Sequence, residues 1–263
     1  MAEVHVIQPA CGACKEGVAA PFPFSMAFQP IVDVKAKRVF AYEALCRGIN
    51  NEPAGKMLSQ VTEENRYSFD QNCRVKAITL ASQLGLEATG AKLSINFMPG
   101  AVYSPAACIQ LTLETARGLK FPLDRLIFEI TEAEEVRDRM HIVRIADEYR
   151  KHGFQMALDD FGAGYSGLNL LADLAPEVVK LDMDVTRNLD KRPVALTIVR
   201  HMMELCGELG MDVIAEGVET VDEYEALVDC GVSLMQGYLL ARPVFESLPG
   251  FTLPKAVPVA AAV

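Results

Sequence analysis

The apolar residues of the chain fall into eight short runs that are rich in β-branched and aromatic side chains, and such runs predict β-strands. The first two runs are separated only by the polar residues 33–38, which are too few for a helix, so we expect a hairpin there. The predicted strands are residues 26–32, 39–45, 92–97, 126–130, 155–158, 178–181, 212–215 and 233–239.

Amphipathic stretches of helical length lie between the later strands, at residues 70–84, 104–118, 136–152, 193–209 and 221–230. Alternation of strand and helix predicts parallel pairing. Eight such strands suit a closed, TIM-like (β/α)8 barrel, modified at its first two strands, although periodicity leaves an open doubly wound sheet as the alternative. We expect one barrel domain over residues 21–248, preceded by a segment over residues 1–20 and followed by a tail over residues 249–263.

Composition narrows the class of protein. The 263 residues carry a net charge of −10, which argues against a surface for nucleic-acid polymers, because phosphates require clustered Lys and Arg. We find no apolar run long enough to span a membrane and no pattern of a secretory signal. The seven cysteines, an odd number, do not resemble a secreted disulfide framework, so we expect a cytoplasmic protein.

Almost every predicted strand has a polar or charged residue at or just beyond its C-terminal end. Any single one of these residues could simply cap the following helix. In a parallel barrel, however, the strand ends meet on one face, which is where barrel enzymes carry their chemistry. The set is Gln29, Glu43, Asn96, Glu129, Asp159, Asp160, Lys180, Glu216 and Gln236.

The five carboxylates in this set would repel one another unless cations lay among them. Because the candidate ligands are all oxygen donors, we expect Mg²⁺ or Mn²⁺ rather than zinc. Asp159 and Asp160 precede a glycine-rich loop, where both could reach a pair of ions that clamp a phosphodiester and activate water. Lys180 could orient that water or stabilise the transition state; the alternative is a lysine that only pairs with a barrel carboxylate.

The sequence around these positions contains an ordered series of motifs. They are FQPIVD (28–33), YEAL (42–45) with Arg47 after it, SINF (94–97), FEITE (128–132), DDFGAGYSGL (159–168), KLD (180–182), AEGVET (215–220) and QGYLLARP (236–243). Through them the chain resembles the EAL-domain family of cyclic di-GMP phosphodiesterases from residue 26 to about residue 243. The family reaction opens one phosphodiester of cyclic di-GMP to give linear pGpG.

The resemblance implies a role for each matched residue. The ligands of one metal ion would be Glu43, Asn96, Glu129 and Asp159, and those of a second ion Asp159, Asp160 and Glu216. Lys180 would contact the nucleophilic water, and Gln236 would bind near that water or near the metal ions. The substrate would be bound by Gln29, Leu45, Arg47 and Asn96. Two further carboxylates would act in support. Glu132 would hold the loop that begins at Asp160 in its productive position, and Glu219 would support the second metal site. The family also implies a homodimer.

The chain departs from the family's usual pattern at two places. Gly48 and its neighbours follow Arg47 where many relatives have an aromatic residue, which could change guanine packing. The loop reads GAGYSG rather than GTGYSS, which could change its stiffness. Since no expected ligand is lost, an active phosphodiesterase is favoured over a regulatory module that keeps only the barrel. A third interpretation is an unrelated Mg²⁺-dependent barrel enzyme with another phosphorylated substrate.

Cys11 and Cys14 form a CxxC motif outside the region of resemblance. A single CxxC supplies half of a tetrahedral zinc site, so it could bind metal with other ligands, act as a redox pair, or belong to an unstructured or merely packed tail. The sequence identifies no regulatory partner.

Overall fold

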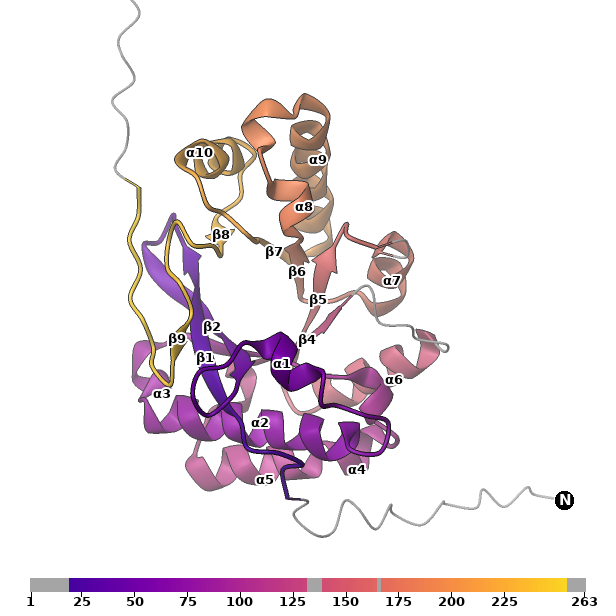
Figure 1. The fold of residues 1–263 in the computed structure, drawn as a ribbon. Coiled ribbons are helices and arrows are strands. Elements are labelled where there is room, and N and C mark those ends of the chain that lie inside the picture. Colours follow the sequence, from indigo (N-terminus) through magenta and orange to yellow (C-terminus); the bar gives the residue numbers. More distant parts are fainter. Residues whose placement is uncertain (1–18, 132–138, 165–166, 255–263) are drawn as a thin grey trace, which may run out of the picture.

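The centre of the molecule is a closed barrel of eight β-strands surrounded by helices (Figure 1). It is seen in a computed structural model that describes residues 19–131, 139–164 and 167–254. All eight strands overlap the predicted ones, so the prediction of a TIM-like barrel is confirmed. The strands are β1 (Ser25–Asp33), β2 (Arg38–Arg47), β3 (Lys92–Asn96), β4 (Leu126–Thr131), β5 (Gln155–Phe161), β6 (Val178–Leu181), β7 (Asp212–Ala215) and β8 (Leu234–Met235).

The strand pairing shows how the barrel closes. β1 and β2 form the antiparallel hairpin expected from their short connection. From β2 to β8 every neighbouring pair is parallel. β1 then pairs antiparallel with β8, where Val32 lies opposite Met235, and this pairing completes the ring. The alternative of an open sheet is therefore wrong.

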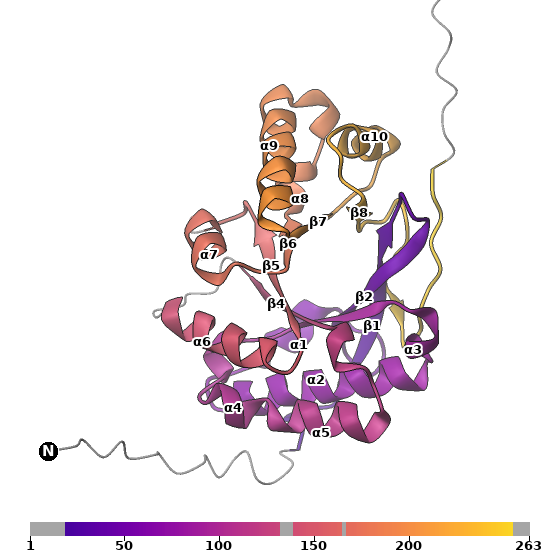
Figure 2. The same cartoon turned by 180° about the vertical axis from the view of Figure 1, so that it is seen from behind.

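The helices pack around the barrel in two groups, with α1 to α6 on one side and α8 to α10 on the other (Figures 1 and 2). The helices are α1 (Ala54–Leu58), α2 (Arg66–Gln83), α3 (Leu86–Thr89), α4 (Pro105–Cys108), α5 (Gln110–Leu119), α6 (Arg139–Arg150), α7 (Gly167–Leu174), α8 (Met183–Thr186), α9 (Pro193–Leu209) and α10 (Val221–Asp229). The predicted helical stretches are found at α2, α4 with α5, α6, α9 and α10. Helices α1, α3, α7 and α8 were not predicted: α1, α3 and α8 are too short to show an amphipathic period, whereas α7 buries Leu170, Leu171 and Leu174 at a helical spacing that could have identified it. Among the described residues, no helix combines the length and apolarity that crossing a membrane requires.

Two apolar clusters form the core. The larger one fills the space between the barrel and the helices. The smaller one lies inside the barrel and receives residues from seven strands, which makes the barrel a packed core rather than a pore. Its buried members are Ile31, Ala41, Ile127, Ala157, Val178, Ile214 and Leu234.

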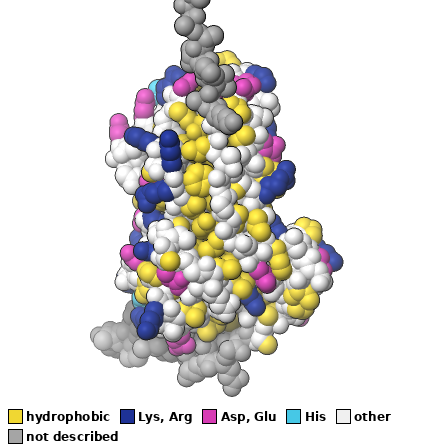
Figure 3. Space-filling model, turned by 90° about the vertical axis from the view of Figure 1, so that its left-hand side faces the viewer, with side chains coloured by type: hydrophobic (Ala, Val, Ile, Leu, Met, Phe, Trp, Pro, Cys, Tyr) yellow, Lys and Arg dark blue, Asp and Glu magenta, His cyan; other side chains and the backbone are white. Residues whose placement is uncertain are grey.

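The chain after β8 runs back along the outside of the barrel. A short strand that was not predicted, β9 (Val244–Phe245), pairs with β1. The carbonyl of Pro249 then accepts a hydrogen bond from the Tyr42 hydroxyl at 3.0 Å, and the Thr252 amide donates to the Leu240 carbonyl at 2.9 Å. On this face hydrophobic side chains form a band bordered by charged ones (Figure 3). The first residues of the predicted tail, 249–254, thus lie against the barrel.

Candidate metal centre and ligand pockets

Alternation along the strands explains why polar side chains gather at one end of the barrel. Successive side chains of a strand point to opposite faces, so a residue and the second one after it point the same way. Six strands place a polar side chain two positions after an apolar residue of the inner cluster. The pairs are Ala41 and Glu43, Ile127 and Glu129, Ala157 and Asp159, Val178 and Lys180, Ile214 and Glu216, and Leu234 and Gln236.

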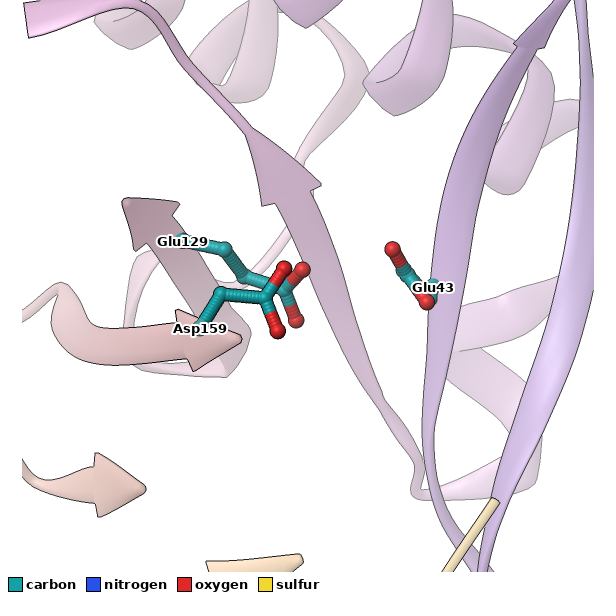
Figure 4. A group of neighbouring side chains, drawn as sticks. All are labelled: Glu43, Glu129 and Asp159. Carbon is teal, nitrogen blue, oxygen red and sulfur yellow. The ribbon is translucent and has the colours of Figure 1, made fainter. Parts of the chain in front are cut away.

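The ammonium group of Lys180 lies at the centre of the polar layer. Its Nζ is 2.8 Å from Glu216 Oε1, 2.9 Å from Asp159 Oδ1 and 3.0 Å from Glu129 Oε2, and a fourth carboxylate, Glu43, lies 3.8 Å away. The carboxylates of Glu129 and Asp159 lie side by side, and that of Glu43 faces them from β2 (Figure 4). The structure therefore brings together four acidic side chains from four strands around one buried cation.

A local departure from regular strand geometry brings in a fifth carboxylate. In a regular strand Asp159 and Asp160 would point to opposite faces. Asp160 instead has φ +53°, in the left-handed region, and the pairing of β5 with β6 shifts register between Leu158 and Phe161. Carboxylate oxygens of Asp159, Asp160 and Glu216 consequently lie within 4.8 Å of one another. Oxygens of Glu43, Glu129 and Asp159 form a second such group, which shares Asp159 with the first.

Hydrogen-bond donors hold these carboxylates in place. Glu43 accepts bonds of 2.8 Å from the side-chain amides of both Asn96 and Gln236. Glu129 accepts a short bond from the Ser94 hydroxyl. Both glutamates are thus fixed by side-chain donors from other parts of the barrel end, and the amide oxygen of Asn96 is left for another partner.

The charges at the site are not balanced within the described residues, where five carboxylates face one lysine. Burial raises the pKa of Glu216 to about 8, and burial followed by the charge of Asp159 raises the pKa of Asp160 to about 6. Burial also raises the pKa of Glu129 well above its ordinary value, although Lys180 opposes this shift. In the absence of further positive charge, all three carboxyls are therefore protonated more easily than ordinary ones.

Glu43 and Lys180 are shifted toward their charged forms. Burial opposes the charge of Glu43, but Lys180 and then the two amide donors lower the pKa of this carboxyl. Burial likewise opposes the charge of Lys180, but the surrounding carboxylates, Asp159 foremost, raise the pKa of the ammonium well above its ordinary value. Lys180 consequently remains a cation at neutral pH.

The donor set fits hard divalent cations. Two groups of three oxygen donors share one carboxylate, and the excess negative charge is of the kind that bound cations neutralise. The side-chain oxygen of Gln236 is buried and has no hydrogen-bond partner among the described residues, so it could accept a bond from a water molecule at the site. No histidine or cysteine belongs to either group, which disfavours zinc.

Two pockets open on either side of the carboxylates. One, of about 470 Å³, is lined mainly by apolar residues of β2, β3 and α2, including Leu45 and Phe97. The other, of about 260 Å³, is lined by residues of the loops after β6, β7 and β8, including Tyr238. Glu43 and Asp160 line both pockets, so the acidic group lies at their junction.

The remaining predicted site residues are distributed around the pockets. Gln29 lines the smaller pocket, and its amide donates to the Ala241 carbonyl at 3.1 Å. The Arg47 guanidinium donates to the Cys46 carbonyl at 2.8 Å, and Glu219 pairs with Arg187 at 2.8 Å rather than joining the acidic group. Glu132 lies outside the described residues, as does the N-terminal CxxC motif.

Sequence reasoning missed three residues of this region. Ser94 lies on β3 two residues before Asn96, and this period-two spacing was a signal that could have identified it. Asp182 and Tyr238 line the smaller pocket. They lie in loops, where no periodicity points to them, although Asp182 belongs to the quoted motif KLD (180–182) and Tyr238 to QGYLLARP (236–243).

Comparisons with known proteins give a consistent result. The family model for the EAL domain matches residues 23–243. The chain is 27% identical over 229 residues to a blue light- and temperature-regulated antirepressor of Escherichia coli, covering 87% of this chain and 56% of that protein. It is 30% identical over 227 residues to a cyclic di-GMP phosphodiesterase of Pseudomonas aeruginosa, covering 84% of this chain and 38% of that protein.

Solved structures are similar in fold and in sequence. The crystal structure of a standalone EAL protein from Vibrio cholerae, in its c-di-GMP-bound form, has a TM-score of 0.85 and 52% identity, covering 89% of this chain and 98% of that chain. The BlrP1 protein of Klebsiella pneumoniae, in complex with manganese and cyclic di-GMP, has a TM-score of 0.81 and 33% identity, covering 87% of this chain and 58% of that chain.

Proposed function

The chain belongs to the EAL domain family, and on that premise we propose that it is a metal-dependent phosphodiesterase that hydrolyses cyclic di-GMP to linear pGpG. The observation that carries the proposal is the convergence of five carboxylates and Lys180 at the junction of two pockets. A cyclic dinucleotide has two anionic phosphodiesters between two planar bases. An acidic centre that binds cations, flanked by two pockets, suits such a ligand.

The two oxygen-donor groups are the proposed ligands of two Mg²⁺ or Mn²⁺ ions. One group is Glu43, Glu129 and Asp159, with Asn96 beside it, and the other is Asp159, Asp160 and Glu216. Ions bound there would supply Lewis-acid activation of the scissile phosphodiester and of a water molecule. The protein holds the ligand oxygens in position with the amides of Asn96 and Gln236 and the hydroxyl of Ser94.

Lys180 has a separate role in this proposal. It is buried, and the surrounding carboxylates keep it charged, so its N–H groups are fixed donors at the bottom of the site. Such a donor orients an attacking water and stabilises negative charge that develops on the phosphodiester. We expect Lys180→Ala to lower kcat more than it weakens substrate binding, and a pure loss of affinity would contradict the catalytic role.

The substrate would lie across the junction of the pockets. The apolar pocket beside Leu45 offers a surface for one guanine, and the loop pocket beside Gln29 and Tyr238 offers a surface for the other. Arg47 lies two residues after Leu45 on β2 and lines neither pocket; in this proposal its guanidinium would exchange its bond to the Cys46 carbonyl for a phosphate oxygen. This arrangement centres a phosphodiester on the carboxylates.

The decisive experiment is conversion of cyclic di-GMP to pGpG by the purified protein, followed by chromatography with and without Mg²⁺ or Mn²⁺. We expect metal-dependent product, no product in the presence of a chelator, and no product from Glu43→Gln. Turnover by Glu43→Gln at the wild-type rate would contradict the ligand assignment. The matched control is Glu204→Gln, an exposed glutamate of α9 that pairs with His201.

A second candidate function is a regulatory module that binds cyclic di-GMP without turning it over. It is favoured by the similarity to a relative that is named an antirepressor. The two functions differ in one measurement. Binding of cyclic di-GMP in calorimetry, together with no product at saturating Mn²⁺, would support the module and exclude the phosphodiesterase.

A homodimer and a cytoplasmic location are part of the proposal. Large apolar side chains are exposed on α7 and α9, where Leu168 is 64% and Val194 is 74% accessible, and a second copy could cover them. None of the five cysteines of the described residues is in a disulfide, which suits a reducing compartment. Light scattering of the purified protein tests the dimer.

A further inference from the structure

Two cysteines lie together in the wall of the larger pocket. Cys46 is on β2, between Leu45 and Arg47, and Cys73 is on α2. Both residues line the same pocket of about 470 Å³, and a hydrogen bond between their thiols shifts the pKa of each. They belong to segments that are remote in sequence, so the barrel fold alone brings them into contact.

The two thiols differ in chemical character. The hydrogen bond from Cys73 lowers the pKa of Cys46, opposed by burial and reinforced by the charge of Arg47. The same hydrogen bond, followed by burial, raises the pKa of Cys73 well above its ordinary value. Cys46, which is only partly buried, is therefore the more acidic and more accessible of the two thiols, and Cys73 is the partner beside it.

We propose that Cys46 and Cys73 form a redox-sensitive modification site, which a small hydroperoxide converts into a disulfide that closes the larger pocket. In the first step the Cys46 thiolate attacks the peroxide, the O–O bond breaks, and hydroxide or an alkoxide leaves. Cys46 is thereby oxidised to the sulfenic acid and the peroxide is reduced. In the second step the Cys73 sulfur attacks the Cys46 sulfur, the S–O bond breaks, and the Cys73 proton leaves with the hydroxyl group as water.

The disulfide would act on the ligand through β2. Leu45 lines the same pocket as Cys46, and Arg47 is the next residue of β2. A disulfide holds its sulfurs about 2.0 Å apart, closer than two hydrogen-bonded thiols, so its formation would pull the end of β2 toward α2. This movement displaces the two flanking residues that the proposed function assigns to substrate binding, so the effect on activity rests on that function.

The site differs from the other cysteines of the described residues. Cys108, Cys206 and Cys230 are buried and line neither of the two pockets. Burial raises the pKa of Cys206 and of Cys230, which keeps both as unreactive thiols. Cys206 therefore offers a matched control.

The experiment uses the full chain with Cys11 and Cys14 replaced by Ser, so that the N-terminal cysteines cannot form the disulfide. The metal-free protein is treated with hydrogen peroxide and desalted. Linked peptides are then identified by mass spectrometry, and cyclic di-GMP hydrolysis is measured with Mn²⁺ before and after reduction by dithiothreitol. We expect a Cys46–Cys73 cross-link and a loss of roughly tenfold to a hundredfold in kcat/KM, since small displacements in a site have effects of this size.

Variants separate the outcomes. Cys73→Ser should keep its own activity after peroxide, whereas Cys206→Ser should lose activity as the parent does and recover it on reduction. A cross-link at other cysteines, oxidation of Cys46 without a link to Cys73, or a link that leaves kcat/KM unchanged would each overturn the proposal. The peptide mapping is independent of turnover, so a protein that forms the link but never hydrolyses cyclic di-GMP would refute the proposed function instead.

Discussion

Two buried groups of charged side chains lie on neighbouring parts of the fold, and they differ in charge balance. On α2, Asp70 and Arg74 form an ion pair of 2.7 Å, and both side chains are almost completely inaccessible to solvent. Arg74 lies over the rings of Phe97, Phe128 and Tyr149, and donates to the Tyr149 hydroxyl. At the end of the barrel, four carboxylates surround Lys180 and a fifth, that of Asp160, lies beside them.

The difference in balance indicates what each group does. A buried pair of opposite charges is neutral as a whole, and this one serves the structure: Asp70 also accepts a 2.8 Å bond from the Met98 amide, which fixes the loop after Asn96. A buried group with a large excess of one charge is incomplete without ligands. Asp70 also lines the larger pocket, so excess charge, rather than pocket position, distinguishes the site from the structural ion pair.

The strongest test of the balanced group is Arg74→Met, which removes the cation and leaves Asp70 buried and unpaired. We expect a loss of about 3–5 kcal/mol in the free energy of unfolding, measured with urea. The double variant Arg74→Met with Asp70→Asn should recover much of this loss. Arg139→Met provides the control at an exposed pair with Asp173, and it should cost less than about 1 kcal/mol. Equal losses of stability for Arg74→Met and Arg139→Met would contradict the structural role of the Asp70–Arg74 pair.

The unbalanced group should respond in the opposite way. Asp159→Asn removes one negative charge from the excess, so we expect unchanged or increased stability without metal but a loss of more than roughly a hundredfold in kcat. Saturating Mn²⁺ at about 100 times its Kd should stabilise the wild type by about 2.7 kcal/mol, and this gain should disappear in the variant. Thermal unfolding with and without Mn²⁺ measures it, with Asp173→Asn as the control. A wild-type response to Mn²⁺ from Asp159→Asn would contradict a shared ligand.

A smaller effect is expected from Ser94→Ala, which removes the donor that holds Glu129. The carboxylate would keep its contact with Lys180 but could rotate, so we expect Mn²⁺ affinity and kcat to fall by about 10–100-fold. Ser94→Thr keeps the hydroxyl and should keep more of the activity. Calorimetry with Mn²⁺ gives the affinity directly. If both variants bind Mn²⁺ as the wild type does, Ser94 only fills space.

The sequence was informative where chemistry follows strand periodicity. The barrel and the residues that meet at its end could be predicted because each strand repeats the same spacing of apolar and polar positions, as with Ile127 and Glu129. The Asp70–Arg74 pair could not be predicted, because an acidic and a basic residue four positions apart are usual on a solvent-exposed helix face. Likewise β9 has too few residues for a period, and the pairing of Glu219 with Arg187 depends on tertiary contacts.

The last prediction concerns the pH dependence of the balanced group. Burial raises the pKa of Tyr149 to about 12, although Arg74 opposes this shift. A raised pKa in the folded state gives a contribution to stability that is complete below the unfolded pKa of about 10 and is lost as the pH rises through 12. Between pH 9 and pH 11 the wild type should lose about 1.4 kcal/mol more than Tyr149→Phe.

Urea unfolding of both proteins at the two pH values measures this difference, and ionisations shared by the two proteins cancel in it. Tyr103→Phe, at a tyrosine that is 59% exposed, controls for the loss of a hydroxyl as such. Parallel pH profiles for the wild type and Tyr149→Phe would mean that the phenol ionises equally easily in the folded and unfolded chains. In that case the Arg74 group would be hydrated, and its contrast with the acidic end of the barrel would be one of exposure rather than of charge balance.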